Sequence, residues 1–245
     1  MEPQNNNYQG LLEKFAVPLA IVVAGAIIGV SLILALKPAG GTAGPIDPGK
    51  RAVNVKDVKI TADTPYIGKK NAPVTLVLWT DYQCPFCKAI ETGGIPQINI
   101  EPSLPILVKD YVETGKLRVV FKDYAFLGPD STTAALYGRA VWATYPDKYF
   151  EWRTAMYEAQ DEEHAGFGDE ASILALIRKI PGMDANTLKA LVAKNKDQFT
   201  TMITADREEG SAFGIQGTPG SITGTTVIDG AQPLSNFKAA IDAQL

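Results

Sequence analysis

The residues best suited to chemistry are the only two cysteines, Cys84 and Cys87, in the segment TDYQCPFCK. A helix that begins at or near Cys84 would hold both sulfurs on one side, with Pro85 in its first turn, where a missing N–H is harmless. Unpaired N–H groups and the helix dipole lower a thiol pKa at that position. The thiolate is the attacking species in disulfide exchange. The spacing therefore predicts a working dithiol, with Cys84 as nucleophile and Cys87 as resolving cysteine.

Two other uses of the cysteines fit the sequence less well. A tetrahedral zinc site needs four ligands, and the chain adds only one histidine, His164 in DEEHAGFG, with no fourth ligand indicated. A structural disulfide acts chiefly by restricting the unfolded chain, and a bridge across two intervening residues restricts it little. We therefore predict no metal site and no prosthetic cofactor.

The elements around the dithiol predict a small sheet. The run Val74–Trp79 is continuous, apolar and rich in β-formers, as expected of a central strand covered on both faces, and it leads directly into the cysteine motif. Val53–Ile60 alternates enough for a short edge strand, and Leu117–Phe121 is the next strand.

A helical block follows the strand at Leu117–Phe121. Four residues are placed to cap its helices: Ser131, Asp147, Asp169 and Asp184. A weak strand then reaches Ile228, and Ser235 can cap a last helix. We predict an α/β domain over residues 52–245, with a helical insertion at about 131–206 between the two halves of its sheet.

The N-terminal region predicts a membrane anchor. Residues 1–14 form a polar tail, and Phe15–Leu36 carries no charge. About 20 apolar helical residues cross a bilayer, so residues 15–37 are interpreted as one transmembrane helix and residues 38–51, rich in Gly and Pro, as a flexible linker. A cleaved signal peptide, whose apolar region is usually about 7–15 residues, and a buried core helix are the alternatives.

Composition and charge indicate a globular protein and give no sign of nucleic-acid binding. The chain is 46% hydrophobic and 20% charged, as globular proteins are. A net charge of −4 without a Lys/Arg cluster gives no electrostatic reason to bind nucleic acid. One basic residue, Lys14, precedes the anchor, and three follow it: Lys37, Lys50 and Arg51. By the positive-inside rule this count weakly favours a cytoplasmic C-terminus, although long domains translocate largely regardless of charge.

Three segments together resemble the membrane-tethered DsbA family of bacterial thiol–disulfide oxidoreductases: NAPVTLVLWTDYQCPFCK, LRVVFKDYAF and AFGIQGTPG…VIDGAQPLSNFKAAID. The resemblance covers about Pro65 to Leu245 and implies a thioredoxin-like fold with an inserted helical subdomain. It also implies that Thr218-Pro219 is a cis-proline pair beside which an extended substrate lies. The domain would face outside the cytoplasm, act on reduced exported proteins, and be recycled by a membrane-embedded, quinone-linked thiol oxidase.

Three positions depart from this family. Pro85 and Phe86 are the residues expected to tune the dithiol. Phe86 stands where several relatives carry a histidine that can stabilise the thiolate, so the pair should be less strongly oxidising. Leu78 stands where many relatives bury a glutamate beneath the site. The segment after Pro219, residues 220–224, is a poor strand former, so the substrate groove should be looser.

The sequence thus predicts a single-pass, membrane-anchored enzyme on the extracytoplasmic side that donates disulfides to exported proteins. A disulfide reductase or isomerase of the same fold is the nearest alternative. A non-catalytic thioredoxin-like binding module is another, because of Leu78 and the weak segment 220–224.

Overall fold

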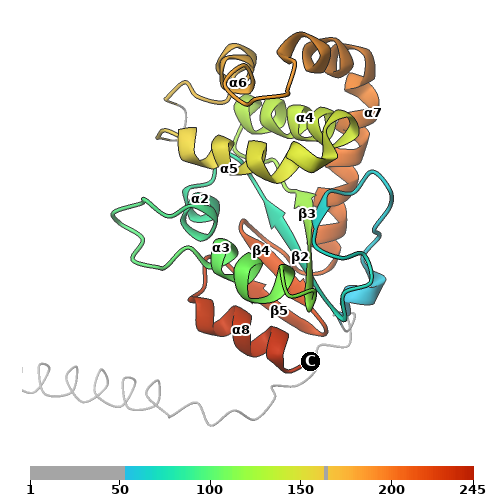
Figure 1. The fold of residues 1–245 in the computed structure, drawn as a ribbon, viewed down its shortest axis with the longest axis vertical. Helices are drawn as coiled ribbons and strands as arrows, with labels where there is room; N and C mark the ends of the chain where they lie inside the picture. Colours follow the sequence, from blue (N-terminus) through green and yellow to red (C-terminus); the bar gives the residue numbers. More distant parts are fainter. Residues whose placement is uncertain (1–52, 163–164) are drawn as a thin grey trace, which may run out of the picture. The chain divides into compact units, whose positions relative to one another are not determined.

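The computed structural model describes residues 53–162 and 165–245, in which five strands form one sheet in the order β1-β3-β2-β4-β5. The central pair, β2 (Val74–Thr80) and β3 (Leu117–Asp123), is parallel, and the other neighbours are antiparallel (Figure 1). The other strands are β1 (Tyr66–Ile67), β4 (Gly220–Thr223) and β5 (Thr226–Asp229). Every residue of β2 except Thr75 is buried, which confirms the predicted central strand.

Four helices lie between β3 and β4, which confirms the predicted helical insertion between the two halves of the sheet. Three helices belong to the sheet half: α2 (Pro85–Glu91), α3 (Ser103–Leu107), which continues as one π-helical turn at Val108–Val112, and α8 (Leu234–Asp242). Four form the insertion: α4 (Pro129–Thr144), α5 (Tyr149–Ala159), α6 (Glu170–Ile177) and α7 (Ala185–Ala212). Figure 1 shows α4, α5 and α6 gathered near the carboxyl ends of β2 and β3.

The predicted caps were right at two helices and wrong at three. Asp169 and Asp184 accept hydrogen bonds from backbone N–H groups in the first turns of α6 and α7. Ser131 instead lies inside the first turn of α4, after a cap at a glycine. Asp147 lies in a short 3₁₀ turn before α5, and Ser235 lies inside α8. Pro129 and Pro233 explain two of these shifts, because a proline favours the start of a helix.

The prediction of an edge strand at Val53–Ile60 was wrong. The Asn54 side chain accepts a hydrogen bond from the N–H of Lys56 and starts a 3₁₀ turn at Val55–Asp57. Local side-chain bonds of this kind compete with strand formation. The apolar residues of the segment still pack against the sheet, in a cluster with Trp79 and Ile222. The edge strand is Tyr66–Ile67 instead.

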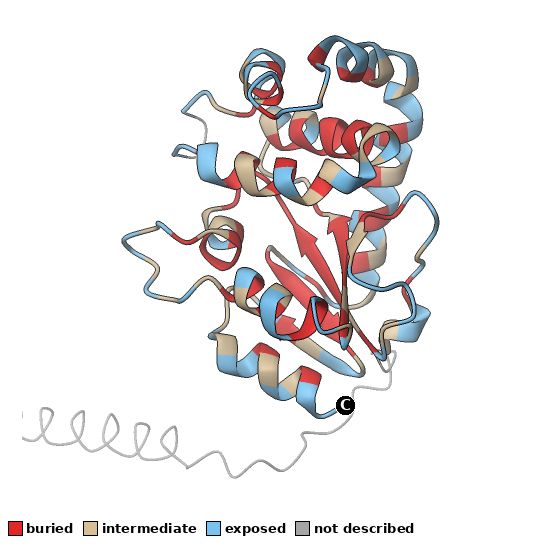
Figure 2. Cartoon of the chain, in the orientation of Figure 1, coloured by how far each residue is buried: buried red, intermediate tan, exposed pale blue. Residues whose placement is uncertain are grey.

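The predicted strand that reaches Ile228 is present as two paired strands, β4 and β5, but the expectation that residues 220–224 form a strand poorly was wrong. Gly220–Thr223 is fully buried and pairs antiparallel with the centre of β2. A Cβ built on Gly220 would meet the Ile215 side chain at 2.4 Å, so the absence of a side chain permits this packing. Tertiary contact outweighs strand propensity here, and the segment is part of the core (Figure 2).

The predicted anchor, tail and linker lie outside the described residues. Among the helices of residues 53–162 and 165–245, none is long and apolar enough to cross a bilayer.

Candidate active site

The cysteine motif lies where the central strand passes into α2. Cys84 is the residue before the helix, with φ −77° and ψ 120°, and Pro85 occupies the first turn, as predicted. Asp81, buried at 1% exposure, stabilises the connecting turn. Its carboxylate accepts hydrogen bonds from the N–H groups of Gln83 and Phe126, both at 2.9 Å. The second of these joins the turn to the loop after β3.

The structure brings Cys84 and Thr218 together although 134 positions separate them. The Cys84 thiol donates a hydrogen bond to the Thr218 carbonyl oxygen at 3.3 Å. The Thr218–Pro219 peptide bond is cis, as the family resemblance implied. Both cysteines are free thiols; Cys84 is 4% exposed and Cys87 is fully buried. Phe86, between them, is half exposed. The structure therefore brings the dithiol segment next to the Thr218–Pro219 segment, with Phe86 as its exposed side chain.

The two thiols have opposite acidities. Hydrogen bonding from the Cys87 thiol is the largest cause that lowers the pKa of Cys84, to about 7; burial opposes the shift, and the N–H groups of Phe86 and Cys87 add to it. Burial raises the pKa of Cys87 well above its ordinary value, and its interactions with Cys84 raise it further. At neutral pH, Cys84 is therefore partly a thiolate while Cys87 keeps its proton.

A buried ion pair beneath the site was not predicted. Glu91, one helical turn after Cys87, accepts a hydrogen bond from Nε of Arg153 on α5 at 2.9 Å. Both side chains are at most 3% exposed, and the guanidinium lies 4.2 Å from the centre of the Phe121 ring. Burial raises the pKa of Glu91, and Arg153 opposes that shift. The four-residue spacing from Cys87 was visible in the sequence, but the partner was not.

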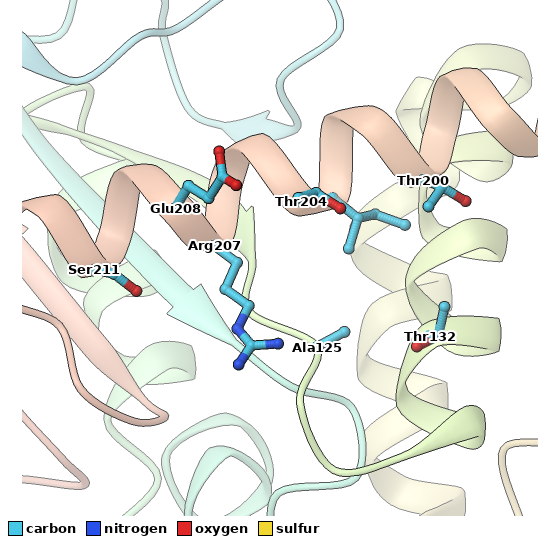
Figure 3. Close-up of a pocket in the computed structure, with 8 residues that line it drawn as sticks. Ala125, Thr132, Thr200, Thr204, Arg207, Glu208 and Ser211 are labelled. Atoms are coloured by element: carbon cyan, nitrogen blue, oxygen red, sulfur yellow. The ribbon is translucent and has the colours of Figure 1, made fainter.

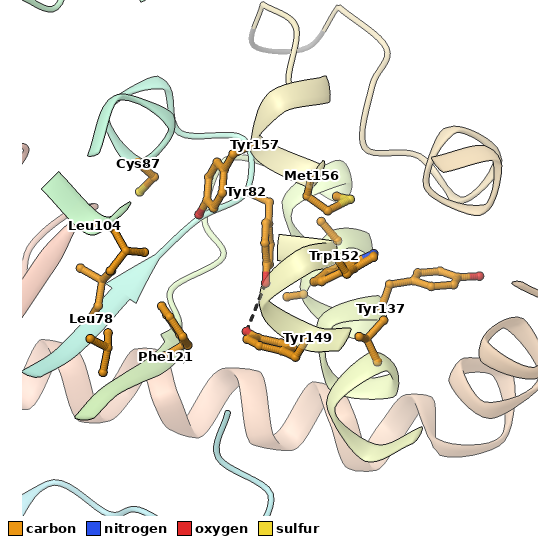
Figure 4. Packing of buried hydrophobic residues seen from close by; sticks show 14 of the residues in the cluster. Leu78, Tyr82, Cys87, Leu104, Phe121, Tyr137, Tyr149, Trp152, Met156 and Tyr157 are labelled. Atoms are coloured by element: carbon orange, nitrogen blue, oxygen red, sulfur yellow. Dashed lines mark hydrogen bonds between the residues drawn. The ribbon is translucent and has the colours of Figure 1, made fainter. Parts of the chain in front are cut away.

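Leu78, one of the three departures that the family resemblance marked, is buried among apolar residues. Figure 4 shows it below Leu104, with Tyr157 between Cys87 and Tyr82. The rings of Tyr82 and Tyr157 stack at 5.3 Å between centres. The only acidic side chain that this buried region receives from α2 is Glu91, and it is paired.

Gln160 was also missed. Its side-chain amide donates to the carbonyls of Tyr82 and Cys84, at 2.6 and 3.2 Å, from the end of α5. No period or motif in the sequence marks such a contact, because it depends on how the insertion packs against α2.

One cavity of the described residues lies away from the dithiol. It has a volume of about 490 Å³ and is lined by residues of α7, by Thr132 of α4 and by Ala125 of the loop after β3, with Arg207 and Glu208 as its charged side chains (Figure 3). No predicted site residue lines it. His164 lies outside the described residues, and within them no three metal-binding side chains cluster.

Comparison with known proteins finds relatives that cover most of the described domain. The family model described as Thioredoxin matches residues 61–243. Disulfide bond formation protein D of Bacillus subtilis (strain 168) is 26% identical over 181 residues, which cover 74% of this chain and 77% of that protein.

Two solved structures share the fold over most of their length. The oxidised BdbD structure from Bacillus subtilis has a TM-score of 0.65 at 25% identity, and covers 74% of this chain and 92% of that one. The thiol–disulfide exchange protein alpha-DsbA2 from Wolbachia pipientis has a TM-score of 0.61 at 29% identity, with 74% and 86% covered.

Proposed function

Because the chain belongs to the thioredoxin family, we propose that it is an extracytoplasmic protein thiol–disulfide oxidoreductase that introduces disulfides into exported proteins. The observation that carries the proposal is the asymmetry of the dithiol. The pKa of Cys84 is lowered to about 7, chiefly by hydrogen bonding from Cys87, whereas burial raises the pKa of Cys87. The relatives named for disulfide bond formation support the direction of the reaction.

In the first step a substrate thiolate attacks Sγ of Cys84 in the Cys84–Cys87 disulfide. A bond forms between the substrate sulfur and Cys84, the Cys84–Cys87 bond breaks, and Cys87 leaves with the electron pair and takes a proton. Burial favours the protonated form of Cys87. Cys87 is then a slow nucleophile toward the mixed disulfide, because attack requires the thiolate.

In the second step another substrate thiolate attacks the substrate sulfur of the mixed disulfide. The substrate gains a disulfide, and Cys84 leaves as a thiolate. A thiol of lower pKa is the better leaving group, so the lowered pKa of Cys84 favours release of oxidised substrate. The enzyme is left as a dithiol, two electrons reduced.

Substrate would lie along Thr218 and Pro219. The Thr218 carbonyl is within hydrogen-bond distance of the Cys84 sulfur, so a chain segment beside it presents its cysteine to Cys84. Pro85 allows the helix to begin at the reactive thiol. Phe86 has no polar group, so the thiolate relies on Cys87 and on backbone N–H groups.

One observation favours the reverse reaction, a disulfide reductase or isomerase. A thiol pKa of about 7 is that of thioredoxin, whereas the strong oxidant DsbA has about 3.5. The reduction potential of the Cys84/Cys87 pair, measured by equilibration of the full-length protein with glutathione, separates the two. We expect about −180 mV or higher, and a value near −270 mV, where thioredoxin lies, would overturn disulfide donation.

Catalysis itself is tested with two variants. Cys84→Ser should abolish oxidation of a reduced model protein. In Cys87→Ser the Cys84 thiolate can still attack the disulfide of an oxidised model protein and displace one of its sulfurs as a thiolate, but no resolving thiol follows, so a mixed disulfide at Cys84 should accumulate, visible by non-reducing electrophoresis. A Cys84→Ser variant with full function would instead indicate a non-catalytic binding module.

The proposal includes attachment to the cell membrane by residues 15–37, with the domain outside the cytoplasm and a membrane-embedded, quinone-linked thiol oxidase as the recycling partner. The uncharged run Phe15–Leu36 supports the anchor. Full-length protein should stay with membranes after an alkaline wash. Release into the wash would contradict the anchor without affecting the redox proposal.

A further inference from the structure

The end of α5 is held against the start of α2 by reciprocal hydrogen bonds. Gln160 is the first residue after α5, with φ −57° and ψ 121°, and it is 5% exposed. Its amide nitrogen donates to the Tyr82 and Cys84 carbonyls, at 2.6 and 3.2 Å. In return its own carbonyl accepts a 2.6 Å hydrogen bond from Nζ of Lys88 on α2.

These bonds bracket the reactive cysteine. The Tyr82 and Cys84 carbonyls belong to the peptide groups Tyr82–Gln83 and Cys84–Pro85, so one amide group restrains the backbone before and after Cys84. The Cys84 carbonyl also accepts hydrogen bonds from the N–H groups of Cys87 and Lys88 on α2, both at 3.1 Å. An amide NH₂ has two donors, and both have buried acceptors here.

The restrained backbone determines which N–H groups reach the sulfur. The N–H groups of Phe86 and Cys87 stabilise the charged form of Cys84, and no side chain between the cysteines can replace them. The direction in which these N–H groups point depends on the orientation of the Cys84–Pro85 peptide group, whose carbonyl accepts from the Gln160 amide. Without the Gln160 amide this peptide group can rotate, since the other hydrogen bonds to its carbonyl come only from N–H groups of α2.

We propose that Gln160 is a positioning residue for Cys84, through which the helical insertion holds the sulfur facing the N–H groups of the α2 start. The inference rests on the proposed function, because it assigns to the insertion a part in setting the reactivity of that dithiol. Gln160 acts through the backbone and contacts neither substrate nor the reacting sulfur.

The test is the pH dependence of Cys84 alkylation by iodoacetamide in the full-length, reduced protein, with the modified site identified by mass spectrometry. Gln160→Met keeps the length of the side chain and removes both donors. We expect its rate at pH 6 to fall about three- to tenfold, which a shift of half to one pKa unit produces. At high pH, where Cys84 is fully a thiolate, the rate should match that of the wild type.

Gln83→Met is the matched control. Gln83 is another buried glutamine, in the turn before α2, and its amide donates to the Phe167 carbonyl of the insertion at 2.9 Å. It does not bind a carbonyl next to Cys84, so its variant should keep the wild-type alkylation profile. An equal shift in both variants would overturn the role of Gln160, as would an unchanged profile in Gln160→Met.

Gln160→Asn covers the case in which the Met variant fails to fold. It keeps an amide, but one methylene shorter, so the donors cannot reach both carbonyls, and a shift in the same direction is expected. An unshifted profile in a folded Asn variant overturns the proposal. A wild-type profile centred on the ordinary cysteine pKa would instead contradict the proposed function, which separates the two failures.

Discussion

Two buried ion-pair clusters join the helical insertion to the sheet half, and they are built differently. Next to the dithiol, Arg153 pairs with Glu91 alone, and both are almost fully buried. In the second cluster, which lies between β3, α4 and α7, Lys122 pairs with Asp206 and Glu209. Arg139 pairs with Asp123 and with the same Asp206. Side-chain exposure reaches 17% in this second cluster.

The difference lies in redundancy. Within the second cluster Asp206 pairs with both cations, so loss of one cation leaves it a partner. Arg153 has no second carboxylate among the described residues, and Glu91 has no second cation. A buried charge without its partner is strongly destabilising. The interface that carries the active site therefore depends on one pair, whereas the distal interface distributes its charges.

The largest expected effect comes from breaking the single pair. Arg153→Met should lower the free energy of unfolding by about 3–5 kcal/mol, because it leaves the Glu91 carboxylate buried and unpaired. Urea denaturation measures the change. The double variant Arg153→Met with Glu91→Leu should recover most of it. A double variant as unstable as the single one would show that the loss comes from packing rather than from charge.

The dithiol itself should make the free energy of unfolding of the reduced protein depend on pH. The folded state of the reduced protein releases the Cys84 proton near pH 7, whereas an unperturbed thiol keeps it to about 9.0. Between these values the unfolded state binds more protons, so stability rises from pH 7 to 9 and is lost as pH falls through 7. The two units correspond to about 2–3 kcal/mol.

Urea denaturation of the reduced protein at pH 6 and pH 9, compared with Cys84→Ser, measures this gain. The distal cluster is the same in both proteins, so it cancels in the comparison. A pH dependence that persists unchanged in Cys84→Ser would assign it to other groups.

The distal cluster should tolerate the same kind of change better. Lys122→Met should lower the free energy of unfolding by about 1–3 kcal/mol, the typical effect of an unsatisfied buried partner. Lys122 loses bonds to Asp206 and Glu209, but Arg139 still pairs with Asp206. Measured beside Arg153→Met under the same conditions, an equal or larger loss would contradict the redundancy argument.

The smallest effect is expected at an exposed pair, which supplies the baseline for the other two. Lys148 and Glu151 lie 2.8 Å apart with side chains 39% and 49% exposed. Lys148→Ala should change the free energy of unfolding, measured by urea denaturation, by less than about 0.5 kcal/mol, because solvent screens exposed pairs. A loss of stability close to that of Lys122→Met would mean that burial does not determine how much each ion pair contributes to the free energy of unfolding.

Much of the fold follows from local pattern. The apolar run before the cysteines predicted β2, because a strand covered on both faces is continuously hydrophobic. Asp169 and Asp184 marked two helix starts correctly, since a cap is a local interaction. The same reasoning failed at Gly220–Thr223, where β-propensity is low but the strand pairs with β2, and a side chain at Gly220 would clash with Ile215.

The candidate site divides in the same way. The sequence by itself determined the dithiol, the helix that begins at it and the order of elements around it, because spacing, capping and periodicity act within a few residues. Only the tertiary structure decided what surrounds Cys84: the Thr218 carbonyl, the Gln160 amide and, below, the Arg153 charge. These contacts join positions more than 60 apart, and they depend on the packing of whole elements, which no local pattern encodes.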